Sequence, residues 1–229
     1  MAEQVTFSSN GGSCGGVFAV PATGRGPGVV VIQEWWGLVP HIENLVDRFA
    51  EAGFVALAPD LFHGVTTTEP DEAMRLMMAL AMDPAAKDIA GAARFLFESD
   101  PTNGVGIGAV GFCMGGSLAL WSATLAPQLT AAVGYYPALP WDRMSPEWPN
   151  YSGKAAMIHC SEEDGTSSAS GIQQAKTAIE ESGGTVELFD YPGTHHAFVN
   201  DDRPGVYNAA ASAEAWERTT TFLHDRLSG

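Results

Sequence analysis

Residues 105–116 read Val-Gly-Ile-Gly-Ala-Val-Gly-Phe-Cys-Met-Gly-Gly, and this stretch decides the fold class. The apolar run 105–112 predicts a buried strand, and a helix is expected directly after it, from about 115 to 125. Between them stands Cys113, with a glycine two residues before it and another two residues after it. A sharp turn from strand to helix needs glycine at those places, because larger side chains would collide. The stretch therefore predicts a nucleophile elbow, although a small buried core cysteine is the alternative.

At such an elbow, Cys113 lies above the first turn of a helix. Free backbone N–H groups and the positive end of the helix dipole stabilise an anion there. A thiol in that place forms a thiolate more easily than a thiol in water.

The rest of the chain continues the alternation of strands and helices. The expected strands are 28–33, 54–58, 105–112, 131–136, 155–160 and 185–191, and the expected helices are 41–52, 71–82, 85–98, 115–125, 168–182 and 209–227. Pro84 is expected to separate two of these helices. The rhythm predicts an α/β fold with a mostly parallel central sheet and helices on both faces, in one domain that spans 1–229. In such sheets the chemistry lies beyond the carboxyl ends of the strands.

Composition narrows the class of protein further. The 229 residues include 11 basic and 27 acidic side chains, for a formal charge of −16, which argues against nucleic-acid binding. No apolar stretch is long enough to cross a bilayer, and the first residues lack the pattern of a signal peptide, so we expect a cytoplasmic protein without a membrane partner. The three cysteines have no CxxC spacing, and we expect neither a metal site nor a cofactor.

A thiol nucleophile needs a base, and the base needs an acid to orient it. His195 and His196 follow the strand 185–191, and spacing alone does not choose between them. For the acid, residues 162–164 (Glu-Glu-Asp) follow the strand 155–160, with a solvated acidic face as the alternative. The order nucleophile, acid, histidine is the order found in α/β-hydrolases.

The remaining histidines and cysteines are expected to be structural. We expect His41 and His224 on solvated helix faces, and His159 in the core. Cys14 is expected in an early hairpin turn and Cys160 at the end of a strand.

Glu34 directly follows the apolar strand 28–33 and precedes Trp35 and Trp36. The tryptophans suggest a partly desolvated pocket, in which the pKa of the carboxyl would rise. A solvent-exposed carboxylate is the alternative.

Together these segments resemble the dienelactone hydrolase family. The resemblance extends from about residue 15 to 227 and rests on Gln33-Glu34-x-x-Gly37, Ala58-Pro59-Asp60-Leu61-Phe62, Gly111-Phe112-Cys113-Met114-Gly115-Gly116 and His196-x-Phe198. It implies a single-domain α/β-hydrolase fold with a triad of Cys113, Asp164 and His196. It also implies that Glu34 contacts the resting thiol and that the backbone N–H groups of Trp35 and Met114 form the oxyanion hole.

The chain departs from the family where well-studied members carry a substrate-binding arginine. That position is Asn200 here, which leaves the dienelactone substrate open. Arg203 and Trp36 are the candidate substrate-binding residues. The methionines at 74, 77, 78 and 82 are expected in the core, with an apolar acyl pocket as the alternative.

These features predict a cofactor-free, cysteine-dependent hydrolase of small carboxylic esters or lactones, acting through an acyl-thioester intermediate as a monomer or small homo-oligomer. One alternative is a redox-sensing or aldehyde-processing protein that uses Glu34 and Cys113 without a triad. Another is a binding domain with a degenerate site.

Overall fold

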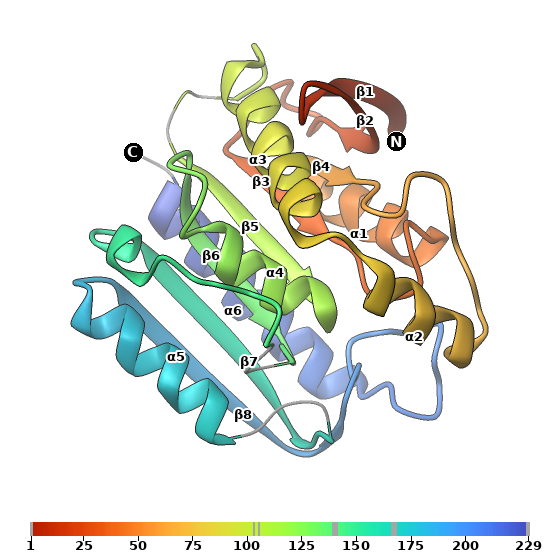
Figure 1. Ribbon diagram of the computed structural model, residues 1–229, viewed down its shortest axis with the longest axis vertical. Coiled ribbons are helices and arrows are strands. Elements are labelled where there is room, and N and C mark those ends of the chain that lie inside the picture. Colours follow the sequence, from red (N-terminus) through yellow and green to blue (C-terminus); the bar gives the residue numbers. More distant parts are fainter. Residues whose placement is uncertain (1, 103, 105, 139–141, 166–168, 228–229) are drawn as a thin grey trace.

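One eight-stranded sheet forms the centre of the molecule, in a computed structural model that describes residues 2–102, 104, 106–138, 142–165 and 169–227 (Figure 1). The strand order is β1-β2-β4-β3-β5-β6-β7-β8. The strands are β1 Glu3–Ser9, β2 Gly12–Ala19, β3 Gly28–Ile32, β4 Val55–Pro59, β5 Ile107–Phe112, β6 Leu129–Tyr135, β7 Ala155–Glu163 and β8 Thr185–His195. The helices are α1 Pro40–Glu51, α2 Pro70–Ala79, α3 Met82–Glu98, α4 Met114–Ser122, α5 Ala169–Glu181 and α6 Ala209–Leu227, with a short 3-10 helix at Trp148–Tyr151.

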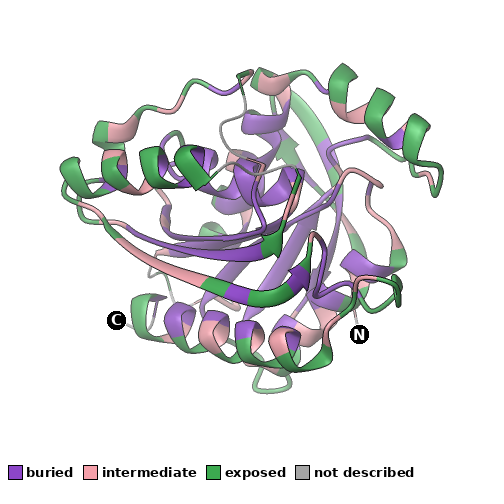
Figure 2. Ribbon diagram, turned by 90° about the horizontal axis from the view of Figure 1, so that it is seen from below, coloured by how far each residue is buried: buried purple, intermediate pink, exposed green. Residues whose placement is uncertain are grey.

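Helices cover both faces of the sheet, as the sequence predicts. The helices α3, α4 and α5 contribute to one hydrophobic core, and α1 and α6 contribute to the core on the opposite face. Strands from β4 through β3 to β8 run parallel, and their central members are buried on both sides. Figure 2 shows the buried strands between helices whose outward sides are exposed. The expected α/β class is therefore confirmed.

The first two strands form an antiparallel hairpin, whose strands the sequence analysis did not predict and whose turn it placed at Cys14. The turn lies at Asn10 and Gly11, both with positive φ, and β2 then pairs antiparallel with β4. Cys14 was expected in the turn, but it lies within β2 and is buried. Within β2 the side chain of Cys14 faces the core, because alternate residues of a strand face opposite sides of the sheet.

Pro84 does not separate the two helices at 70–98. The break lies at 80–81, and α3 already begins at Met82 with Pro84 inside its first turn. Proline fits there because the first N–H groups of a helix have no intrahelical partner. Of the expected elements, residue 105 of one strand and residue 168 of one helix lie outside the described residues.

The carboxyl ends of four parallel strands meet at one edge of the sheet. The residue or second residue after β3, β5, β7 and β8 is Glu34, Cys113, Asp164 and His196 respectively. No helix in the described part of the chain is both long and apolar enough to span a membrane.

Candidate active site

Cys113 lies in a strained turn between β5 and α4. Its backbone has φ 57° and ψ −119°, a conformation that residues other than glycine rarely adopt. A Cβ atom at Gly111 would lie 1.9 Å from the carbonyl oxygen of Gly115, and one at Gly115 would lie 2.4 Å from that of Gln33. The flanking glycines are therefore required by close backbone contacts, as the elbow interpretation predicts.

His196 is held by an aspartate from the neighbouring strand end. Its Nδ1 lies 2.8 Å from Asp164 Oδ2, and the same carboxylate oxygen accepts a 2.8 Å hydrogen bond from Ser161 Oγ. The Asp164 side chain is 5% exposed, and that of His196 is 20% exposed. Of the two histidines that spacing left open, His196 is the one that contacts Asp164. His195 points elsewhere and pairs with the exposed Glu163 at 3.2 Å.

The electrostatic environment of His196 favours its protonated form. Burial lowers the pKa of the imidazole, but hydrogen bonds to Asp164 and Cys113 and the charges of both groups raise it to about 10. The ring also packs edge-on against Tyr136, at 4.9 Å between ring centroids. An imidazole that bridges a thiol and a carboxylate in this way is the arrangement of an activated nucleophile.

Tyr136 is a site residue that the sequence analysis missed. It follows β6, has a positive φ of 37°, and is fully buried beside Cys113 and Glu34, whose charges help burial to raise its pKa. Its hydroxyl has no hydrogen-bond partner among the described residues. The available signal was its place directly after a buried strand at the carboxyl edge of the sheet.

Glu34 is buried rather than exposed to solvent. It is 1% exposed, and its Oε2 accepts a 2.8 Å hydrogen bond from Asn200 Nδ2. Burial raises its pKa, while His41, Asn200 and His196 act in the opposite direction. The expectation of a raised pKa in a desolvated pocket is confirmed. Asn200, where the resemblance led us to expect a substrate-binding arginine, therefore holds the glutamate.

His41 was expected to be solvated, and this is wrong. Its side chain is 4% exposed, and its Nδ1 lies 3.4 Å from Asp201 Oδ1. Pro40 begins α1, so His41 lies in the first helical turn at the carboxyl edge of the sheet, where Glu34 also lies. His159 was expected in the core and lies there, bonded to Tyr191 and Thr219.

A cavity of about 160 Å³ lies above Cys113. Its walls are Glu34, Trp35, Trp36, Met74, Met77, Cys113, Met114, Ala138, His196, Ala197 and Arg203. Every predicted site residue except Asp164, which lies behind His196, is among them.

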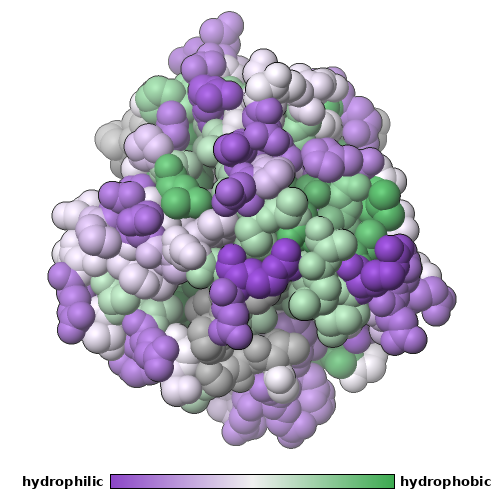
Figure 3. Space-filling model, in the orientation of Figure 1, coloured by the Kyte–Doolittle hydropathy of each residue, from purple (hydrophilic) through white to green (hydrophobic). Residues whose placement is uncertain are grey.

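The α2 methionines form one wall of this cavity, not the core alone. Met74 and Met77 line it, and Met74 and Met78 are 46% and 56% exposed. The expectation that all of them are core residues is wrong for the exposed Met74 and Met78, because α2 lies at the rim of the fold. Figure 3 shows hydrophobic surface on the right of this face, where Figure 1 places α2.

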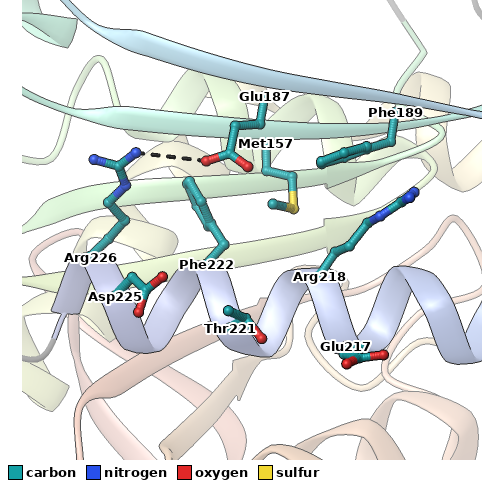
Figure 4. Close-up of a pocket in the computed structure, with 9 residues that line it drawn as sticks. All are labelled: Met157, Glu187, Phe189, Glu217, Arg218, Thr221, Phe222, Asp225 and Arg226. Carbon is teal, nitrogen blue, oxygen red and sulfur yellow. Dashed lines mark ion pairs between the residues drawn. The ribbon is translucent and has the colours of Figure 1, made fainter.

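Larger cavities occur elsewhere, and the one between β8 and α6 lacks this chemistry. One of about 470 Å³ lies between β8 and α6 (Figure 4). Arg226 pairs with Glu187 at 3.7 Å across it, and the Arg218 guanidinium lies 4.2 Å from the centre of the Phe189 ring. None of the described residues that line it is a cysteine, serine or histidine. A cleft of this kind offers charge but no activated nucleophile.

Comparison with known proteins assigns the family. The sequence profile of the dienelactone hydrolase family matches residues 14–227. The chain belongs to the dienelactone hydrolase family. Protein usf of Aquifex pyrophilus is 34% identical over 235 residues and covers 100% of both chains. A candidate carboxymethylenebutenolidase of Aquifex aeolicus is 31% identical, with 99% of this chain and 100% of that protein covered.

A solved structure shows the same fold. The crystal structure of a candidate dienelactone hydrolase from Klebsiella pneumoniae superposes with a TM-score of 0.85 at 24% identity, covering 96% of this chain and 97% of that one. Membership of the dienelactone hydrolase family confirms the enzyme class expected from the sequence, a hydrolase of carboxylic esters with a small-molecule substrate.

Proposed function

We propose that this dienelactone hydrolase family member hydrolyses small, uncharged carboxylic esters or lactones through an acyl-thioester on Cys113. The observation that carries the proposal is the position of His196, which interacts with Asp164 on one side and with Cys113 on the other. The elbow supports it, because a helix N-terminus and a strained turn present the sulfur to the cavity.

Acylation begins when the Cys113 thiol gives its proton to His196. The thiolate attacks the carbonyl carbon of the ester, and the carbonyl oxygen becomes an oxyanion that the backbone N–H groups of Met114 and Trp35 stabilise. Collapse of this intermediate breaks the bond to the alcohol oxygen, which takes the proton from His196. The alcohol leaves, and the acyl group remains on sulfur.

Deacylation uses the same histidine as a base. His196 removes a proton from a water molecule, whose oxygen attacks the thioester carbonyl. The second intermediate expels the Cys113 thiolate and releases the carboxylic acid. Asp164 keeps the imidazole in the tautomer that faces the sulfur through both halves of the reaction.

The charges around the cavity favour uncharged substrates. Glu34 is a buried carboxyl group in the cavity wall, and the chain carries a formal charge of −16. The amide of Asn200 already donates to Glu34, so a neutral group holds the place of a substrate-binding arginine. Arg203 is exposed, and its guanidinium lies 5.8 Å from the centre of the Trp36 ring at the rim. An anionic substrate gains little there and meets the field of Glu34.

The redox alternative has less support. It needs Glu34 and Cys113 but no Asp–His pair, and here the pair is present and raises the pKa of His196 to about 10.

Steady-state hydrolysis of p-nitrophenyl acetate and butyrate tests the chemistry. We expect Cys113→Ala and His196→Ala to lose activity by about 10⁴-fold or more, in line with losses of triad members elsewhere. Matched controls are Cys160→Ala and His195→Ala, since they remove the same residue types beside the site. Activity of His196→Ala within tenfold of the wild type would rule out the triad.

A charged ester tests the substrate class separately. We expect kcat/KM for p-nitrophenyl hemisuccinate to be at least tenfold below that for the butyrate ester. Equal or higher values for the charged ester would contradict the preference and leave the triad intact.

A further inference from the structure

A second group of one cysteine, one histidine and one aspartate lies outside the cavity of Cys113. Cys14 belongs to β2, His63 to the loop after β4, and Asp88 to α3. One possible ligand atom from each residue lies within 4.8 Å of the other two. Three segments that are far apart in the sequence thus bring a sulfur, a nitrogen and an oxygen close together.

The aspartate and the histidine are oriented toward each other. Ser9 Oγ donates a short hydrogen bond to Asp88 Oδ1, which leaves Oδ2 to face His63 Nε2 at 3.5 Å. In tetrahedral zinc sites the ligand atoms lie about 3.3–3.8 Å apart, as follows from metal–ligand distances of about 2.0–2.3 Å. A hydroxyl that fixes a carboxylate ligand is also typical of metal sites.

Hydrogen bonds of Asp60 hold the loop that carries His63 next to the strand of Cys14. Asp60 accepts hydrogen bonds from the backbone N–H groups of Phe62 and Gly64, at 3.1 and 2.5 Å. The N–H of Asp60 donates to the carbonyl of Gly15 at 2.9 Å. His63 itself has a positive φ of 51° and a side chain that is 61% exposed, so its imidazole can move toward a ligand from the solvent side.

The negative charge of the buried Asp88 carboxylate is only partly balanced by its neighbours. The Asp88 side chain is 5% exposed, and the only ion-pair partner found for it in the described part of the chain is the exposed His63. A buried carboxylate needs a close cation or several hydrogen bonds to offset the loss of hydration.

We propose that Cys14, His63 and Asp88 bind a divalent transition-metal ion of the zinc class. The ligands are the thiolate sulfur, the imidazole nitrogen and the carboxylate oxygen, with water in the fourth position on the open side near His63. The thiol proton passes to solvent when the metal–sulfur bond forms, so binding releases one proton. This inference departs from the sequence, which predicts no metal site.

Such a metal would join the β1–β2 hairpin to the loop after β4 and to α3. Because the unfolded chain does not hold the three ligands together, binding stabilises the folded protein in proportion to the logarithm of the metal concentration over Kd. The role is structural, since the group lies outside the cavity that holds Cys113.

Zinc titration of the Cys113→Ala variant tests the proposal, because this background removes the partly exposed thiol of the other group. After chelation of resident metal, we expect one Zn²⁺ per chain by calorimetry and a melting temperature that rises with Zn²⁺ concentration. Co²⁺ in place of Zn²⁺ should give a thiolate charge-transfer band. Adding Cys14→Ser or His63→Gly should weaken Zn²⁺ binding by about 100-fold or more, since even outer-shell changes cost 10–100-fold.

Cys160→Ser in the same background is the matched control, since it removes a buried thiol outside the group, and it should bind Zn²⁺ as the parent does. His63→Gly remains informative if Cys14→Ser does not fold, because glycine suits the positive φ and the side chain is exposed. Absence of Zn²⁺ binding by the parent, or equal affinity in His63→Gly, would overturn the proposal.

Discussion

Two groups of cysteine, histidine and aspartate lie in the described part of this chain, and their surroundings differ at every position. Cys113 stands in a turn at the N-terminus of α4 and lines a cavity. Cys14 lies inside β2, is buried, and has a thiol whose pKa is raised to about 12. The dipole and free N–H groups of a helix favour a thiolate, whereas burial in a strand favours the thiol.

The histidines differ as much as the thiols. His196 is 20% exposed and bonds Asp164 at 2.8 Å, so its ring is fixed between a carboxylate and the sulfur of Cys113. His63 is 61% exposed and lies 3.5 Å from Asp88. The comparison teaches that residue types alone do not define a triad. In the proposed triad the imidazole of His196 is partly buried and held in one orientation next to a partly exposed sulfur. In the proposed metal site the imidazole of His63 is exposed and the sulfur is buried.

The largest expected effect separates the two thiols. Cys113→Ala should lower kcat/KM for p-nitrophenyl butyrate by about 10⁴-fold or more. Cys14→Ala should leave kcat/KM within about threefold at 25 °C, because the residue does not line the cavity. Parallel assays of both variants measure this, with circular dichroism to check folding. A loss of similar size in both would erase the distinction.

The second-largest expected effect separates the two carboxylates, Asp164 and Asp88. Asp164→Asn should lower kcat by about 10²–10⁴-fold, since an amide favours the wrong imidazole tautomer. Asp88→Asn should change kcat by less than about threefold, because its partners are Ser9 and His63. Steady-state kinetics on one ester suffices, and an unchanged kcat in Asp164→Asn would contradict the orienting role.

The buried parallel strands and the elbow could be predicted from sequence because their signals are local. Short apolar runs mark β3, β4 and β5, and glycines flank Cys113 where the backbone needs them. The hairpin of β1 and β2 gave no such signal. Its strands are rich in serine and glycine and only partly buried, so the pairing of β1 with β2 and of β2 with β4, rather than composition, makes them strands.

Sequence could also place Cys113, Asp164 and His196 at one edge of the sheet, given strand order and the family resemblance. It could not find the second group, because His63 is a lone loop residue and Cys14 was assigned to a turn. Asp88 did offer a signal, since it lies among the apolar residues on the buried face of α3. A carboxylate at such a position needs a partner, which only the fold reveals.

The pH dependence of stability tests whether His196 holds a proton in the folded protein. The pKa of His196 is raised from 6.5 to about 10 in the folded protein. Between these values the folded state binds a proton that the unfolded chain has lost. The stabilisation is therefore complete below pH 6.5 and disappears as pH rises to about 10, with a slope of at most about 1.4 kcal/mol per pH unit.

Denaturant unfolding between pH 6.5 and 10 measures this slope. His196→Gln should show a smaller decline in the free energy of unfolding than the wild type. Identical slopes in the wild type and His196→Gln would mean that the thiol and the carboxylate do not hold this proton.

The smallest effect concerns the buried carboxyl group of the active site. Because burial raises the pKa of Glu34, its favourable contribution is present below the ordinary pKa of 4.5 and is lost as pH rises through the folded value. Above the folded value the ionised group costs stability, and Glu34→Gln removes that cost while keeping an acceptor for Asn200. We expect the melting temperature to rise by about 2–4 °C at pH 7, equivalent to about 1 kcal/mol, and by less at pH 4. A rise in Glu34→Gln that is equal at pH 4 and pH 7 would show that packing, not charge, makes Glu34 costly. A rise confined to neutral pH would show that the active site keeps a destabilising charge.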